Sequence, residues 1–179
     1  RHTRLDGVTG VRRVIFRSEQ ESIKRDVEYA QQNLRLRLLD RQEQFLRLAR
    51  DIASNDINDD VFIAQAEDLI SKHPELHAVS WIDNKQKVIA TYTVASAINT
   101  QIRRIGDKLS KRESESGYAL VKDTSGPVYT HTITTDNAGV LPILQIFVPI
   151  QDHGRFAGLI LGEYSIEGLL RFGVPSEVN

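Results

Sequence analysis

The chain has 179 residues, of which 40% are hydrophobic and 26% are charged, and its formal net charge is -1. This composition fits one folded domain plus an extended element, and it excludes a disordered chain. The small net charge gives no reason to expect a nucleic-acid partner. The chain contains no cysteine, which excludes disulfides, thiolate metal sites and a cysteine nucleophile.

No stretch of the sequence is long and apolar enough for a membrane-spanning helix. Residues 1–13 are basic, but the apolar segment that a signal peptide requires does not follow them. Because the chain does not begin with Met, we expect it to be part of a longer protein, with a membrane segment outside these residues.

A long helix is predicted for residues 18–53. Ser18 and Glu21 form the S-x-x-E pattern of a capping box, and neither Gly nor Pro interrupts the segment. Apolar residues recur at heptad spacing, and such a helix would be about 50 Å long, more than a small domain can cover. Arg41 falls on the heptad seam, so the sequence predicts a weak or adjustable coiled coil. The seam positions are Ile23, Val27, Ala30, Leu34, Leu38, Arg41, Phe45, Leu48 and Ile52.

The rest of the chain changes from helical to strand periodicity. After a break at residues 54–60, a second helix is expected at 60–72, ended by Pro74. Alternation of apolar and polar residues then predicts strands, interrupted by a helix at 95–112 and followed by a short terminal helix capped by Ser165. The expected strands are 78–82, 87–93, 117–121, 128–135, 141–150 and 156–164. The predicted fold class is α+β, with an antiparallel sheet of about five strands and flanking helices.

This order of elements resembles the extracytoplasmic PAS-like sensor domains called PDC or Cache domains, which occur in histidine kinases and chemoreceptors. The resemblance is carried by Leu76–Asp83 with its hairpin, by residues 144–150, and by residues 155–162. Pro-Ile, a turn and a Gly between two apolar strands are typical of the last hairpin of this family. Pro-Glu-Leu and Trp-Ile-Asp near the first strand look most like dicarboxylate-sensing kinases.

The resemblance implies a division of the chain. Residues 1–17 would be a tail or the membrane-proximal start, and residues 18–55 a signalling and dimerisation helix. Residues 56–172 would be a single sensor module. Residues 173–179 would be a linker, leading in tandem relatives to a second module.

The family's ligands bind between the sheet and the segment that covers it after the first hairpin. Carried over to this chain, that position implies a set of polar ligand-binding candidates: Tyr92, Arg103, Arg104, Tyr118, Tyr129, His131, Gln145 and Tyr164. Relatives that bind amino acids carry Arg-x-Trp-Tyr on the cover. Residues 103–105 lack these aromatics, so the resemblance disfavours an amino-acid ligand and leaves a small anion, held by the two arginines and His131.

Each candidate also has a plain structural reading. Tyr129 and His131 share one strand face, which is either a pocket wall or an ordinary sheet surface. Gln145 interrupts an apolar strand, and its amide needs either a ligand or an internal hydrogen bond. Arg103 and Arg104 could form a solvated helix face. Tyr92 and Tyr164 could be ordinary tyrosines at the strand ends, with the ring packed on the core and the hydroxyl in solvent.

Catalytic and metal-binding patterns are absent from the sequence. No nucleophile elbow, phosphate loop, dinucleotide fingerprint or zinc-protease motif occurs. The Asn and Asp residues within 55–60 lack the Gly and Glu of a calcium loop, and Pro74 separates His73 from His77. We therefore expect neither an enzyme nor a cofactor or metal in this part of the protein.

The expected function is the periplasmic sensor domain of an inner-membrane histidine kinase. It would bind a small, anionic metabolite, dimerise through the helix at 18–55, and signal across the membrane through it. Alternatives are a ligand-free dimerisation or spacer module, or the sensor of a chemoreceptor or diguanylate cyclase. A cytoplasmic PAS-type domain with a cofactor is a further alternative.

Overall fold

The computed structural model describes residues 2–94, 102–136 and 139–173. Its centre is a five-stranded antiparallel sheet in the order β2-β1-β5-β4-β3. The strands are β1 (Leu76–Asp83), β2 (Val88–Thr93), β3 (Val128–Asp136), β4 (Gly139–Asp152) and β5 (Arg155–Ser165). The predicted α+β class and the antiparallel sheet are therefore confirmed, with five strands in the described part of the chain.

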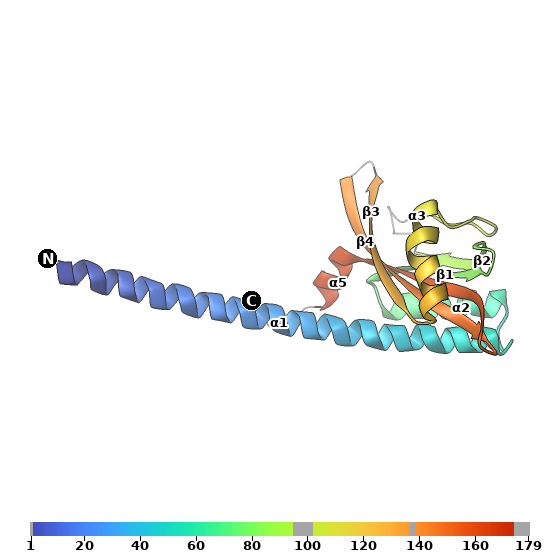
Figure 1. The fold of residues 1–179 in the computed structure, drawn as a ribbon, viewed down its shortest axis with the longest axis horizontal. Coiled ribbons are helices and arrows are strands. Elements are labelled where there is room, and N and C mark those ends of the chain that lie inside the picture. The colour runs from blue at the N-terminus through green and yellow to red at the C-terminus, as the bar shows by residue number, and fades with distance from the viewer. Residues whose placement is uncertain (1, 95–101, 137–138, 174–179) are drawn as a thin grey trace.

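One face of the sheet, called the helix face below, packs against α1 (His2–Ala53) and α2 (Asp59–Lys72). Figure 1 shows α1 running beneath the sheet and continuing well beyond it. Phe45, Leu48 and Ile52 of α1 and Phe62 of α2 are buried against Val79, Ile146, Val148 and Ile160 of the sheet. The long helix is thus part of the domain core along its C-terminal half.

The opposite face, called the cover face, packs against residues 102–124. Its core contains Ile82, Val88, Phe147, Leu159 and Leu161 from the sheet, and Leu109, Tyr118 and Val121 from the covering segment. That segment contains α3 (Lys111–Glu113), the π-helical η1 (Ser114–Tyr118) and α4 (Ala119–Thr124). The short α5 (Ile166–Gly173) ends the described chain, and Ser165 Oγ accepts the amide proton of Gly168, as a helix cap does.

Two predictions about the long helix are corrected. The helix begins at His2 and not at Ser18, so residues 2–17 are helical and Ser18 lies inside the helix instead of capping it. The heptad seam is also not one continuous free surface. Phe45, Leu48 and Ile52 are buried in the sheet's own core, whereas all side chains from Val14 to Tyr29 are exposed. A partner helix therefore finds the seam free only in the N-terminal half of α1.

Two predictions about the cover are also wrong. Residues 102–110 are not helical, and helix begins only at Lys111, where Ser110 and Glu113 form a capping box. Gly106, at φ +90°, adopts a conformation that side-chain-bearing residues avoid, which explains the irregular chain there. Residues 95–101 of the expected helix, including Ile98, lie outside the described residues.

The second wrong prediction is the strand at 117–121, which is the end of η1 and the start of α4. A short apolar run such as this one has no period that separates strand from helix. Packing explains the outcome, because a side chain at Gly117 would collide with the ring of Phe147. Gly117 therefore lets the cover approach the sheet closely.

Candidate ligand-binding site

The cover face buries a cluster of four polar side chains, called the polar cluster below: Arg103, Glu113, Gln145 and Glu163. Arg103 lies in the irregular segment before α3, Glu113 ends α3, and Gln145 and Glu163 face each other on β4 and β5. Strand alternation puts Gln145 beside Phe147, and Glu163 beside Leu161, on the cover face. The cluster therefore joins the sheet to the segment that follows the first hairpin.

Arg103 is the centre of the polar cluster. Its Nε donates to Glu163 Oε1 at 2.9 Å, and its two terminal nitrogens donate to both oxygens of Glu113, one of them to Oε1 at 3.2 Å. Gln145 Nε2 donates to Glu113 Oε2 at 2.8 Å, and Thr130 Oγ1 donates to the Gln145 carbonyl oxygen at 3.2 Å. A bidentate pairing of guanidinium and carboxylate fixes both groups in orientation as well as in position.

The protonation of the cluster follows from these contacts. Burial lowers the pKa of Arg103, but attraction by Glu163 and Glu113 outweighs it, so the net shift is upward. Burial raises the pKa of Glu113, but hydrogen bonding and attraction by Arg103 outweigh it, so this pKa is lowered. Glu163 is more deeply buried, and there desolvation prevails over Arg103 and raises the pKa. One guanidinium thus faces two carboxyl groups: Glu113 favours its charged form, Glu163 favours its neutral form, and the cluster tends toward charge neutrality.

Tyr118 also lies on the cover face, away from these contacts. It is buried, its hydroxyl donates to the backbone oxygen of Asn84 at 2.9 Å, and its ring packs edge-to-face on Phe156 with centroids 5.4 Å apart. Burial raises the pKa of Tyr118. Of the predicted candidates, the structure therefore brings Arg103 and Gln145 together, with Tyr118 on the same face.

The other five candidates are elsewhere. Arg104 is exposed beside the cluster; its backbone amide donates to Asp107 Oδ2 and its backbone carbonyl accepts from the Asp107 amide. The remaining four belong to the helix face: Tyr92, Tyr129, His131 and Tyr164. Their placement on the opposite side of the sheet removes them from a common pocket with Arg103.

These four side chains differ in exposure. Tyr164, expected at a rim, is fully buried under α1. Tyr92 is half-buried against the same core, and His131 is exposed. The hydroxyl of Tyr129 donates to Gln42 Oε1 of α1 at 2.9 Å. Tyr129 and His131 share a face, as their spacing predicted, but it is the face of α1 and not that of the cover.

Two members of the polar cluster, Glu113 and Glu163, were not among the predicted residues. Glu163 carried the same signal as Gln145, a polar residue at an inward position of an otherwise apolar strand. Glu113 carried the S-x-x-E signal of a capping box with Ser110. Among the described residues, no group of three or more His, Cys, Asp or Glu side chains is placed to hold a metal ion. None of the helices, within the residues described, is long and apolar enough to cross a membrane.

Comparison with known proteins identifies the fold. No family model matches the sequence, and no curated protein is significantly similar to it. Among solved structures, the extracellular domain of mmHK1S-Z2 is similar with a TM-score of 0.57 and 20% identity, over 83% of this chain and 60% of that one. The sensor domain of the V. cholerae histidine kinase DctB has a TM-score of 0.57 and 12% identity, over 88% and 59%.

The ligand-binding domain of the Pseudomonas fluorescens chemoreceptor CtaA, solved with L-serine, has a TM-score of 0.54 and 19% identity, over 79% of this chain and 57% of that one. The chain thus spans less than two thirds of the length of these domains. It has the fold of the extracellular sensor domains of histidine kinases and chemoreceptors, which confirms the predicted PDC or Cache-type architecture.

Proposed function

We propose that this chain is the ligand-sensing part of the periplasmic domain of a membrane-anchored histidine kinase, and that it binds a small polar metabolite. The observation that carries the proposal is the polar cluster, which is buried between the sheet and its cover in a fold shared with sensor domains. Four buried polar side chains at one spot are costly for a purely structural core, because each must keep its hydrogen bonds. They supply directional contacts for a ligand that reaches the cover face.

The charge of the polar cluster argues for a different ligand from the one that the sequence suggested. An anion would have to displace Glu113 or Glu163 from Arg103, which already bonds to both. A ligand with an ammonium group or several N–H donors would instead meet two carboxyl groups against one guanidinium, and its positive charge would favour the ionised form of Glu163. We therefore propose a cationic or zwitterionic metabolite in place of a simple anion.

Signalling would pass through α1, because this helix is buried against the sheet at one end and projects from the domain at the other (Figure 1). The exposed seam residues Ile23 and Val27 offer a second copy an apolar contact at heptad spacing. We propose that the projecting half of α1 forms a homodimer. Light scattering over a concentration series tests it, and a monomer at every concentration would contradict it.

A thermal-shift screen of the 179-residue chain against amines, amino acids, dicarboxylates and nucleobases tests ligand binding. A ligand that binds only the folded state raises the melting midpoint with concentration, and stabilises by about 2.7 kcal/mol at one hundred times its dissociation constant. We expect amines or zwitterions to give the shift and Glu163→Gln to abolish it. Glu115→Gln is the matched control, because Glu115 is exposed on the same covering segment.

A ligand-free spacer is the second candidate function, and one observation favours it. Arg103 and Gln145 bond to Glu113 and Glu163 inside the protein, so the polar cluster is satisfied without a ligand. A spacer would show no selective shift with any compound class. Because both a sensor and a spacer would dimerise, the ligand screen and not light scattering separates the two functions.

A further inference from the structure

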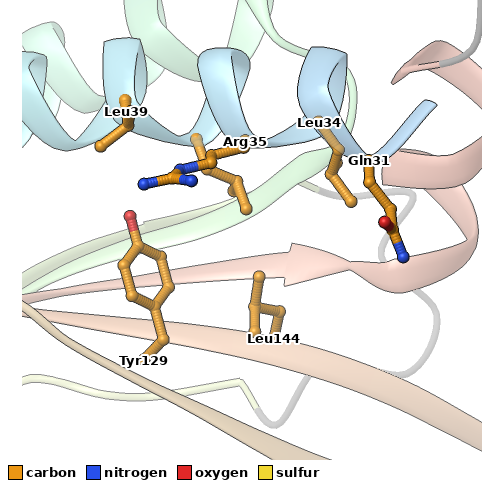
Figure 2. A pocket seen from close by; sticks show the side chains of 7 residues that line it. Gln31, Leu34, Arg35, Leu39, Tyr129 and Leu144 are labelled. Carbon is orange, nitrogen blue, oxygen red and sulfur yellow. The ribbon is translucent and has the colours of Figure 1, made fainter. Parts of the chain in front are cut away.

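A groove opens on the helix face, between α1 and the strands β3 and β4, on the opposite side of the sheet from the polar cluster. Its volume is about 420 Å³, within the range of small-molecule sites. Figure 2 shows Tyr129 and Leu144 rising from the strands toward the helix above them. The lining is aliphatic apart from a few polar ends, and it consists of Gln31, Leu34, Arg35, Leu38, Leu39, Tyr129 and Leu144.

The position of the groove follows from the sequence of α1. Leu34 and Leu38 form one row at i, i+4 spacing and point to the sheet, and Gln31, Arg35 and Leu39 form the neighbouring row. Further along the helix, Phe45 closes onto the sheet over Gly162, where an added Cβ would lie 2.8 Å from the Phe45 ring. Residues 31–39 lie beyond this close contact, and there the helix and the sheet leave a space between them.

Two polar groups line the groove together with the leucines. Arg35 is exposed, and it forms no ion pair with a carboxylate in the described part of the chain. Tyr129 donates its hydroxyl to Gln42 and can turn it to another acceptor. In Figure 2 the guanidinium of Arg35 and the hydroxyl of Tyr129 lie at one end of the groove, and Gln31 at the other. The groove is therefore apolar along its length and cationic at one end.

We propose that this groove binds a free single-chain amphiphilic carboxylate. Its alkyl chain lies between the leucines of α1 and Leu144, and its carboxylate meets Arg35, with Tyr129 as a second donor. Burial of methylene groups supplies the affinity, and the charged pair fixes the direction of the chain.

The dimensions favour a small molecule over a second copy of this protein. Residues 31–39 cover only about 12 Å of helix, since each residue rises about 1.5 Å. A stable protein partner needs about 800 Å² of contact on each side, which two turns of helix over a hairpin do not provide. A single alkyl chain needs no more than this groove.

A ligand in the groove would contact the helix on one side and two strands on the other. Its occupancy would favour those helix positions that keep both contacts. The protein would then have an input on the helix face that acts on α1 directly. This input does not depend on any ligand at the polar cluster.

Isothermal titration of the 179-residue chain with hexanoate, octanoate and decanoate, each below its micelle concentration, tests the proposal. We expect one site per chain and about fourfold tighter binding for each added methylene. Arg35→Gln should weaken decanoate at least tenfold and leave the uncharged decanol unchanged. Arg47→Gln, an exposed arginine of α1 outside the groove, should change neither.

Other results would overturn the proposal. They are no saturable binding of decanoate, an equal loss in the Arg35 and Arg47 variants, or binding to phosphatidylcholine vesicles without binding of free decanoate. A change of molecular mass from dimer to monomer on adding decanoate would show that a second copy occupies the groove. Leu34→Trp, which fills the groove, should abolish binding with a cooperative melting curve, and unchanged binding in a folded Leu34→Trp protein would contradict the site.

Discussion

The polar cluster of the cover face and the α1 side of the helix face bury polar side chains in opposite ways. On the cover face, Arg103 donates to two carboxylates, and Gln145 both donates and accepts. On the helix face, several polar atoms are buried without a hydrogen-bond partner among the described residues. These are Asn33 Nδ2, Arg41 Nε and Gln44 Oε1 of α1, and the Tyr164 hydroxyl beneath them.

This difference separates a fixed contact from an adjustable one. A fully bonded cluster has one low-energy geometry, because displacing any member leaves a buried charge unpaired. A helix packed partly through unpaired polar atoms has fewer such bonds to lose when it slides or rotates by a small amount; those of α1 include Tyr129 to Gln42 and Arg41 to Glu75. Arg41 illustrates this, because its short ion pair, 2.6 Å to Asp40, lies within α1, whereas its contact with Glu75 outside the helix is longer, at 3.5 Å. The cover is thus suited to holding a defined site, and α1 to changing position.

The largest expected effect comes from breaking the polar cluster. Arg103→Met leaves Glu113 and Glu163 buried without their cation, which should cost about 3–5 kcal/mol of unfolding free energy. Arg104→Met is the matched control, because Arg104 is adjacent and exposed, and it should change stability by less than about 0.5 kcal/mol. Urea unfolding measures both. Equal effects of the two variants would mean that the cover face is no more tightly held than the surface.

The pH dependence of stability sharpens the account of the same cluster. Because burial raises the pKa of Glu163, this group stabilises the fold below about pH 4.5, its ordinary value, and the contribution is lost as pH rises through the folded pKa. Glu113 has a lowered pKa, so its contribution is present above about pH 4.5 and is lost as pH falls through the folded pKa. The two residues therefore act in opposite pH ranges.

Glu163→Gln should accordingly reduce the loss of stability between pH 4.5 and pH 7.5, relative to the unsubstituted chain. Glu167→Gln, an exposed residue of α5, should leave the pH profile unchanged. Unfolding free energies in urea at the two pH values provide the comparison. A steeper loss in Glu163→Gln would show that Arg103 outweighs burial and that the pKa of Glu163 is lowered.

Sequence periodicity predicted the sheet well, because alternation fixes which residues of a strand share a face. It does not say which layer that face meets. Gln145 and His131 both looked like pocket residues, yet they lie on opposite faces. The partners of Arg103 are 10 and 60 residues away along the chain, so no local pattern pairs them. The prediction for the cover failed for a different reason. The apolar run at 117–121 is too short for its periodicity to separate strand from helix, and the close packing of Gly117 on Phe147 depends on a residue 30 positions away.

The smallest effect tests the helix face. Tyr164→Phe removes a buried hydroxyl that has no partner among the described residues, so stability should stay the same or rise by up to about 1 kcal/mol. Tyr129→Phe on the same face removes a hydrogen bond to Gln42 and should cost about 0.5–1 kcal/mol. Thermal and urea unfolding of both variants give the comparison. If Tyr164→Phe lowers stability as much as Tyr129→Phe does, the Tyr164 hydroxyl has a hydrogen-bond partner. The buried polar atoms of the helix face would then be hydrogen-bonded like those of the polar cluster, and the physical argument for an adjustable α1 would fail.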